Sequence, residues 1–170
     1  MSLEDFRSVI DVNLYGVVHG TRAFLPHFQR QGSGHVVNIS SINAFVPFAK
    51  NGPYNAAKAA VLGFSETLMQ ELADGPIRVT CVHPGGIQTN IVRNAKGATE
   101  AEARFFQKIA RTTPEQAAAR ILRGIERDER RVYIGGDAHL MAAAKRLLPA
   151  WTVDLVGRLS LNPLAGRARA

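Results

Sequence analysis

A tyrosine and a lysine one helical turn apart are the most chemically suggestive pair in this sequence. Tyr54 and Lys58 are four residues apart, so on a helix both side chains leave the same face. A phenol ordinarily has a pKa near ~10, and a neighbouring ammonium group favours the phenolate and lowers that pKa. A tyrosine tuned in this way can pass a proton to or from an alcohol or carbonyl oxygen.

The pair alone is a weak signal, because aromatic and lysine residues four apart are common on helix surfaces. Other polar groups at fixed places strengthen it. Ser41 lies thirteen residues before Tyr54, where its hydroxyl could hydrogen-bond the same substrate oxygen. By residue type alone Ser40 could do the same. Asn13 lies upstream, and the Gly-containing segment 84–89 lies downstream.

The sequence around these residues predicts alternating helices and strands. The predicted helices span residues 3–28, 53–73 and 113–127, and the predicted strands span residues 35–40, 77–82 and 130–135. This alternation predicts parallel strands joined by right-handed crossovers, hence an open α/β fold. Ser41 and Pro84 follow two of the strands. Both therefore fall at the carboxyl ends, where ligands bind in such sheets.

Taken together and in order, these motifs resemble the short-chain dehydrogenase/reductase family. The resemblance rests on Asn13, Ser41, the Tyr-x-x-x-Lys spacing of residues 54–58 and the Pro-Gly-x-x-x-Thr spacing of residues 84–89. It covers about residues 3–136 without large gaps. It implies a partial Rossmann-like, doubly wound parallel sheet, with three C-terminal strands and flanking helices over residues 1–136. Residues 137–170 would form a basic, amphipathic C-terminal tail.

The resemblance also implies a role for each residue. Tyr54 would be the acid/base, and Lys58 would lower its pKa and hold the nicotinamide ribose. Ser41, which the family's spacing selects over Ser40, would orient the substrate carbonyl. Asn13 would lie at a local helix irregularity and bind a water molecule that relays protons from Lys58.

The same resemblance implies a nicotinamide cofactor, NAD or NADP, and a small-molecule carbonyl or secondary alcohol as substrate. The cofactor-binding residues would be Tyr54, Lys58, Pro84, Gly85, Gly86, Ile87 and Thr89. Residues 90–106, which are polar and poorly periodic, would form a mobile loop that closes over the substrate.

One part of the family pattern does not appear in these 170 residues, namely the Gly-rich turn that binds the cofactor pyrophosphate. Two functions therefore remain open. The chain is either the catalytic portion of an NAD(P)-dependent oxidoreductase or a truncated, inactive remnant that acts as an oligomerising or binding module. In both cases we expect this chain alone to bind the cofactor weakly and to lack turnover.

Composition restricts the remaining possibilities. The chain is 46% hydrophobic and 21% charged, as expected for one globular domain. Its net charge of +7 comes largely from scattered arginines, which does not favour nucleic-acid binding. The single cysteine, Cys81, fits a core position in a cytoplasmic protein. The histidines show no metal-ligand spacing. The tail is expected to pack on the protein itself or on a twin subunit in a homo-oligomer, with membrane-surface contact as the less favoured alternative.

Overall fold

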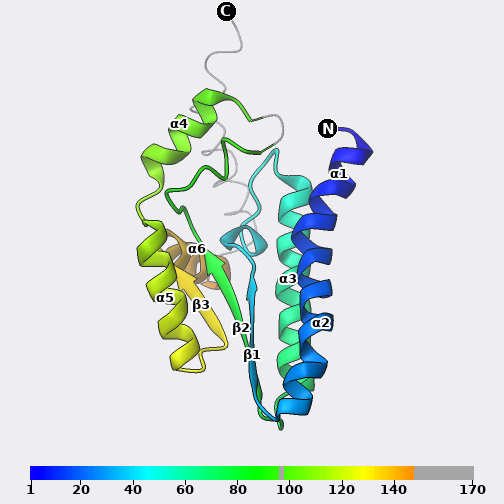
Figure 1. Ribbon diagram of the computed structural model, residues 1–170. Coiled ribbons are helices and arrows are strands. Elements are labelled where there is room, and N and C mark those ends of the chain that lie inside the picture. Colours follow the sequence, from blue (N-terminus) through cyan, green and yellow to red (C-terminus); the bar gives the residue numbers. More distant parts are fainter. Residues whose placement is uncertain (96–97, 148–170) are drawn as a thin grey trace, which may run out of the picture.

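The protein is described here by a computed structural model, which covers residues 1–95 and 98–147. Its centre is a three-stranded parallel sheet in the order β1-β2-β3 (Figure 1). The strands are β1 (Gly34–Ile39), β2 (Ile77–Pro84) and β3 (Arg131–Ile134). The helical elements are α1 (Leu3–Ile10), η1 (Asp11–Tyr15), α2 (Gly16–Gln31), η2 (Ile42–Ala44), α3 (Gly52–Glu71), α4 (Glu100–Ile109), α5 (Pro114–Glu126) and α6 (Gly136–Leu147). The predicted α/β fold is confirmed.

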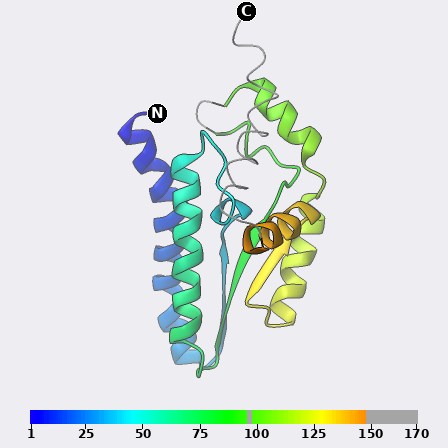
Figure 2. The same ribbon diagram turned by 180° about the vertical axis from the view of Figure 1, so that it is seen from behind.

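Helices cover both faces of the sheet (Figures 1 and 2). On one face α2 and α3 pack side by side against a buried apolar cluster. The cluster consists of Val36, Leu68, Met69, Ile77, Val79 and Cys81. On the other face α5 packs on β2 and β3, where Ala117 meets Val82 and Val132. Cys81 is fully buried and unpaired, as expected for a small core residue.

The first long helix contains an irregular turn. The predicted single helix over residues 3–28 instead consists of α1, the π-helical segment η1 and α2, in continuous succession. A π-helical turn inserts one residue into the regular hydrogen-bond ladder, and such turns are frequent at functional sites. Asn13 lies in this turn, so the irregularity implied by the family resemblance is present. Gly32 ends α2 in the left-handed conformation, with φ of 70°.

Two other predicted segments differ from the structure. The loop expected over residues 90–106 contains most of α4, which begins with a capping box formed by Thr99 and Glu102. The strand predicted over residues 77–82 continues through Pro84, paired with β3. The amphipathic tail begins as α6, which contacts β3, and its remainder lies outside the described residues. The division at residue 136 stays a prediction.

Strand β1 pairs with β2 and has no strand on its other side among the described residues. The backbone N–H of Ser40 donates to the carbonyl of Val82 in β2. Because successive residues of a strand alternate between its two edges, Val37 and Ile39 direct their N–H and C=O groups to the free edge. An apolar strand with a free edge is a template for pairing with another chain.

We therefore expect the chain to self-associate through the free edge of β1, in a concentration-dependent way that sedimentation velocity can measure. Val37→Pro removes an N–H from that edge without removing a bond to β2, so it should weaken the association. Val37→Thr keeps the N–H and the branched shape and serves as the control. A parent chain that stays monomeric at tens of micromolar, with the Val37 and Ile39 amides protected from exchange, would show that something in the chain covers the edge.

Candidate active site

The carboxyl end of β1 and the first turns of α3 are joined by two reciprocal hydrogen bonds. The Ser40 hydroxyl donates to the backbone carbonyl of Lys58 at 2.8 Å. The Lys58 ammonium donates to the backbone carbonyl of Ile39 at 3.0 Å. Ser40 is therefore used to fasten the strand to the helix. This leaves Ser41, the next residue, as the serine beside Tyr54.

Ser41 and Tyr54 meet at this junction. Ser41 is buried and precedes the short helix η2, whose Asn43 N–H donates to the Ser41 hydroxyl oxygen at 3.1 Å. The nearby Ser41 side chain lowers the pKa of the Tyr54 phenol. Burial acts in the opposite direction and more strongly. The pKa of Tyr54 is therefore raised above its ordinary value.

Lys58 is not among the causes of this shift, and the expectation that it lowers the pKa of Tyr54 stays a prediction. The Lys58 Nζ atom lies 5.6 Å from the centre of the Tyr54 ring, and its hydrogen bond goes to Ile39. Lys58 is only 8% exposed, and burial lowers its own pKa. Removal from water penalises the charged forms of both groups. At neutral pH Tyr54 is a neutral phenol.

Two asparagines hold the loop that carries Ser41 against α3. The side-chain amide of Asn43 donates to Asn55 at 3.0 Å, and Asn55 in turn donates to the backbone carbonyl of Phe48 at 2.7 Å. Asn55 is the neighbour of Tyr54 on the helix. The network therefore links the serine and tyrosine segments through polar contacts that the sequence analysis did not identify.

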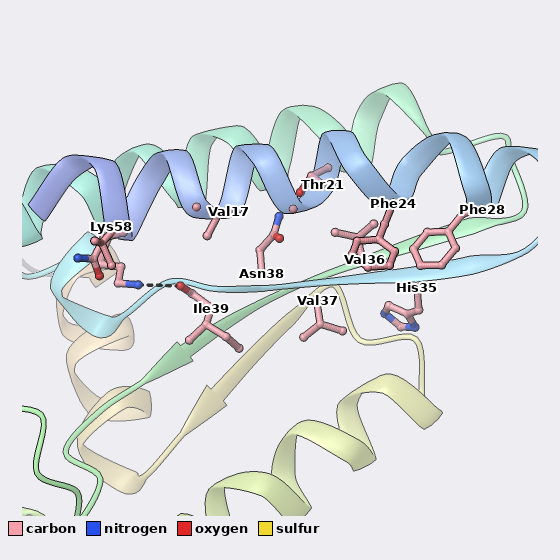
Figure 3. Close-up of a pocket in the computed structure, with 14 residues that line it drawn as sticks. Val17, Thr21, Phe24, Phe28, His35, Val36, Val37, Asn38, Ile39 and Lys58 are labelled. Carbon is pink, nitrogen blue, oxygen red and sulfur yellow. Dashed lines mark hydrogen bonds between the residues drawn. The ribbon is translucent and has the colours of Figure 1, made fainter. Parts of the chain in front are cut away.

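Asn13 and Lys58 line one groove between the η1–α2 helix and β1 (Figure 3). The groove has a volume of about 390 Å³ and runs along the free edge of β1. The Asn13 side chain donates to the Val9 carbonyl of its own helix at 3.0 Å, so the two residues share the groove without a direct bond. Thr21 also lines the groove, and its buried hydroxyl has no hydrogen-bond partner among the described residues.

Asn38, whose side chain also lines the groove, is a structural residue. Its amide donates to the hydroxyl of Ser65, which itself donates to the Val61 carbonyl of α3. These two bonds connect β1 to α3 through side chains and give Asn38 a structural use.

The Gly-containing segment 84–89 passes the same rim of the sheet and is tied to its surroundings along its length. Gly85 N–H donates to the carbonyl of Ile134 at 2.9 Å. Ile87 forms a parallel bridge with Thr112, and Gln88 N–H donates to the Thr112 carbonyl at 2.9 Å. Thr89 follows, and its carbonyl accepts a bond from Gln107 of α4. The segment is a defined strip of backbone at the carboxyl end of β2.

His83 is fully buried directly before this segment. Its ring packs at 4.9 Å from Phe45 and 5.3 Å from Tyr133, measured between ring centres. Among the described residues neither ring nitrogen has a hydrogen-bond partner, and burial lowers the pKa of His83 to about 4. A neutral imidazole in edge-on and tilted contact with two aromatic rings indicates a packing role for His83.

Comparison with known proteins identifies the family. The sequence profile described as short chain dehydrogenase matches residues 1–100 of this chain. The chain belongs to the short-chain dehydrogenase family. The resemblance found in the sequence is thereby confirmed.

Relatives of known sequence and structure agree with this assignment. The Mycobacterium tuberculosis oxidoreductase named SadH is 43% identical over 152 residues, which cover 85% of this chain and 55% of SadH. A short-chain dehydrogenase from Burkholderia cenocepacia in complex with NADP superimposes with a TM-score of 0.72 at 28% identity, covering 86% of this chain and 56% of that one. One from Burkholderia phymatum in complex with NAD gives a TM-score of 0.72 at 25% identity, covering 86% and 58%.

The chain thus spans somewhat more than half the length of these short-chain dehydrogenases. In the described part of the chain, no helix has the length and apolar character needed to cross a membrane. Within the same residues, no three or more side chains of His, Cys, Asp or Glu are grouped as metal ligands.

Sequence reasoning missed one residue beside the Gly-containing segment. The Asp137 carboxylate accepts a hydrogen bond from the Gly86 N–H at 2.7 Å. The two residues are 51 positions apart, and only the pairing of β2 with β3 brings them together. An acidic residue after Gly135-Gly136 at a predicted strand end was the available signal.

The raised pKa of Tyr54 can be measured on the chain itself. We expect the difference in phenolate absorbance between the parent and Tyr54→Phe to show one ionisation step with a midpoint above ~10. Ser41→Ala should move that midpoint higher, because it removes the side-chain hydroxyl that lowers the pKa. Circular dichroism at each pH verifies that the fold persists. A midpoint below that of free tyrosine would contradict the burial argument.

Proposed function

We propose that this chain is the catalytic portion of a nicotinamide-dependent oxidoreductase that interconverts a small-molecule carbonyl and the corresponding secondary alcohol. The observation that carries the proposal is the meeting of Ser41 and Tyr54 at the carboxyl end of β1. The Gly-containing segment 84–89 lies on the same rim of the sheet. A phenol and a serine hydroxyl at the same junction can bind one substrate oxygen together.

The residues present suit a nicotinamide ring and its ribose. Lys58 uses one of its three N–H donors on the Ile39 carbonyl and keeps two for ribose hydroxyls. Because Gly85 and Gly86 have no side chains, their backbone groups are uncovered at the rim. A Cβ atom at residue 86 would lie only 3.2 Å from the Ala110 backbone. The segment Pro84–Thr89 would thus hold the carboxamide through backbone groups. When bound, the reduced cofactor supplies the hydride for carbonyl reduction.

The protonation state of Tyr54 favours the reductive direction. Because burial raises the pKa of this phenol, Tyr54 carries its proton at neutral pH and can donate it to the substrate oxygen. Ser41 would hold that oxygen next to the phenol. Oxidation of an alcohol requires the phenolate, so its rate should rise with pH through the pKa of Tyr54, while the reduction rate should fall over the same range.

Asn13 and Lys58 would supply protons to the site. Both line the groove, and Asn13 lies in the π-helical turn where the backbone ladder is irregular. A water molecule in this groove could receive a proton from Lys58, as the family resemblance implies. None of the described residues distinguishes NAD from NADP.

Cofactor binding tests the proposal on the chain as it stands. We expect reduced nicotinamide mononucleotide, which lacks the adenosine half, to shift the amide resonances of Lys58 and of residues 85–89. NADH should bind no more than about threefold more tightly, since the groups that contact adenine and pyrophosphate in such folds are not among these residues. Micromolar affinity for NADH would overturn the expectation of weak binding, and unshifted site resonances would overturn the cofactor assignment.

Turnover tests the role of Tyr54. The chain should be combined with the part of SadH that lies outside the match, and carbonyl-dependent NAD(P)H oxidation followed. Tyr54→Phe should lower kcat by orders of magnitude, because it removes only the group that transfers the proton. Tyr15→Phe is the matched control, since Tyr15 lies on η1 at 50% exposure. Activity of Tyr54→Phe within threefold of the parent would remove Tyr54 from the reaction.

A second candidate function is supported by the free edge of β1. That edge and the groove beside it could bind a strand from another copy of the chain, so that the protein acts as an oligomerising module without turnover. Self-association combined with unshifted site resonances would favour this module. A monomeric chain whose site resonances shift on addition of the nucleotide would favour the oxidoreductase.

A further inference from the structure

Asp137, the second residue of α6, lies directly against the Gly-Gly pair of the proposed nicotinamide site. Its Oδ2 atom accepts the Gly86 N–H at 2.7 Å. The same carboxylate occupies the space that a Cβ atom at Gly85 or Gly135 would require. Gly135 also has φ of 93°, which other residues rarely adopt. Glycine at positions 85 and 135, which has no Cβ atom, therefore leaves room for the carboxylate.

The carboxylate is itself held in place by its helix. Asp137 lies in the first turn of α6, where the partial positive charge of the helix N-terminus stabilises an acidic side chain. The next residue, Ala138, is fully buried and anchors this turn to the protein. Asp137 thus extends from a fixed helical turn toward two consecutive glycines, whose backbone has more conformational freedom than that of other residues.

The geometry points to Asp137 as a positioning residue for the nicotinamide segment, an inference that rests on the proposed function. Gly85 N–H is held by the carbonyl of Ile134, and Gly86 N–H is held by Asp137. Further along, the bridge between Ile87 and Thr112 fixes the segment again. Between these two ends the glycine pair depends on Asp137 for its conformation. The carboxylate therefore orders the backbone groups that would receive the carboxamide.

Two substitutions separate positioning from general stability. Asp137→Asn keeps an oxygen acceptor of the same reach, whereas Asp137→Ala removes the acceptor. Without ligand, Asp137→Ala should speed amide hydrogen exchange at Gly86 about fivefold or more, and Asp137→Asn should stay near the parent. Asp74→Ala, which removes an exposed acid in the turn after α3 at the other end of β2, is the matched control.

The ligand measurement uses reduced nicotinamide mononucleotide and the shifts at Lys58 and residues 85–89. Asp137→Ala should weaken binding about fivefold, and Asp137→Asn should restore most of the loss. Equal binding by the parent and Asp137→Ala would overturn the positioning role alone. Lower melting temperature without faster exchange at Gly86 would also overturn it, because the residue would then support only α6. No response in the parent would overturn the proposed function and, with it, the nicotinamide role of Asp137.

Discussion

The reciprocal hydrogen bonds between β1 and α3 are the constraint on which the site depends. Ser40 donates to the Lys58 carbonyl while Lys58 donates to the Ile39 carbonyl, so strand end and helix are joined at two adjacent points. Ser41 follows Ser40, and Tyr54 lies one turn before Lys58. The register of the junction therefore decides that Ser41 and Tyr54 meet. The Ser40 bond is buried and the Lys58 bond is partly buried, so an unpaired donor or acceptor there would be costly.

The same burial determines the charge state of the site. A lysine that is 8% exposed and a phenol in the same shielded region both resist ionisation, because the protein replaces only part of their hydration. Sequence spacing alone favoured the opposite shift for Tyr54, since it gives the distance along a helix but not the direction of an ammonium group. Lys58 points to the strand carbonyl, and burial of the phenol decides the sign of the pKa shift.

Much of the fold followed from local signals in the sequence. The start of α5 is predicted by the capping box of Thr113 and Gln116 together with Pro114. Strand β1 is predicted by the β-branched residues before Ser40. The π-helical turn at Asn13 came only through the family resemblance, because no periodicity marks one inserted residue. Helix α4 was missed although half of its residues are apolar, because its capping box falls in a polar stretch.

Contacts between distant segments could not be predicted from local sequence patterns. The bond between Gly86 and Asp137, like that between Asn43 and Asn55, depends on strand order and helix position, which the sequence gives only in outline. Such contacts fix the loops that surround the site. The roles assigned to Asn13, Ser41, Tyr54 and Lys58 remain predictions that the geometry allows.

The free edge of β1 and the position of Lys58 are physically coupled. Ile39 directs its carbonyl toward that edge, and Lys58 binds this oxygen. A strand paired along the edge would bring its own N–H groups to the same row of carbonyls. It would then compete with the ammonium group for Ile39 and displace it into the groove shared with Asn13. Pairing along the edge and the position of Lys58 are therefore linked through one contact, the bond from Lys58 to Ile39.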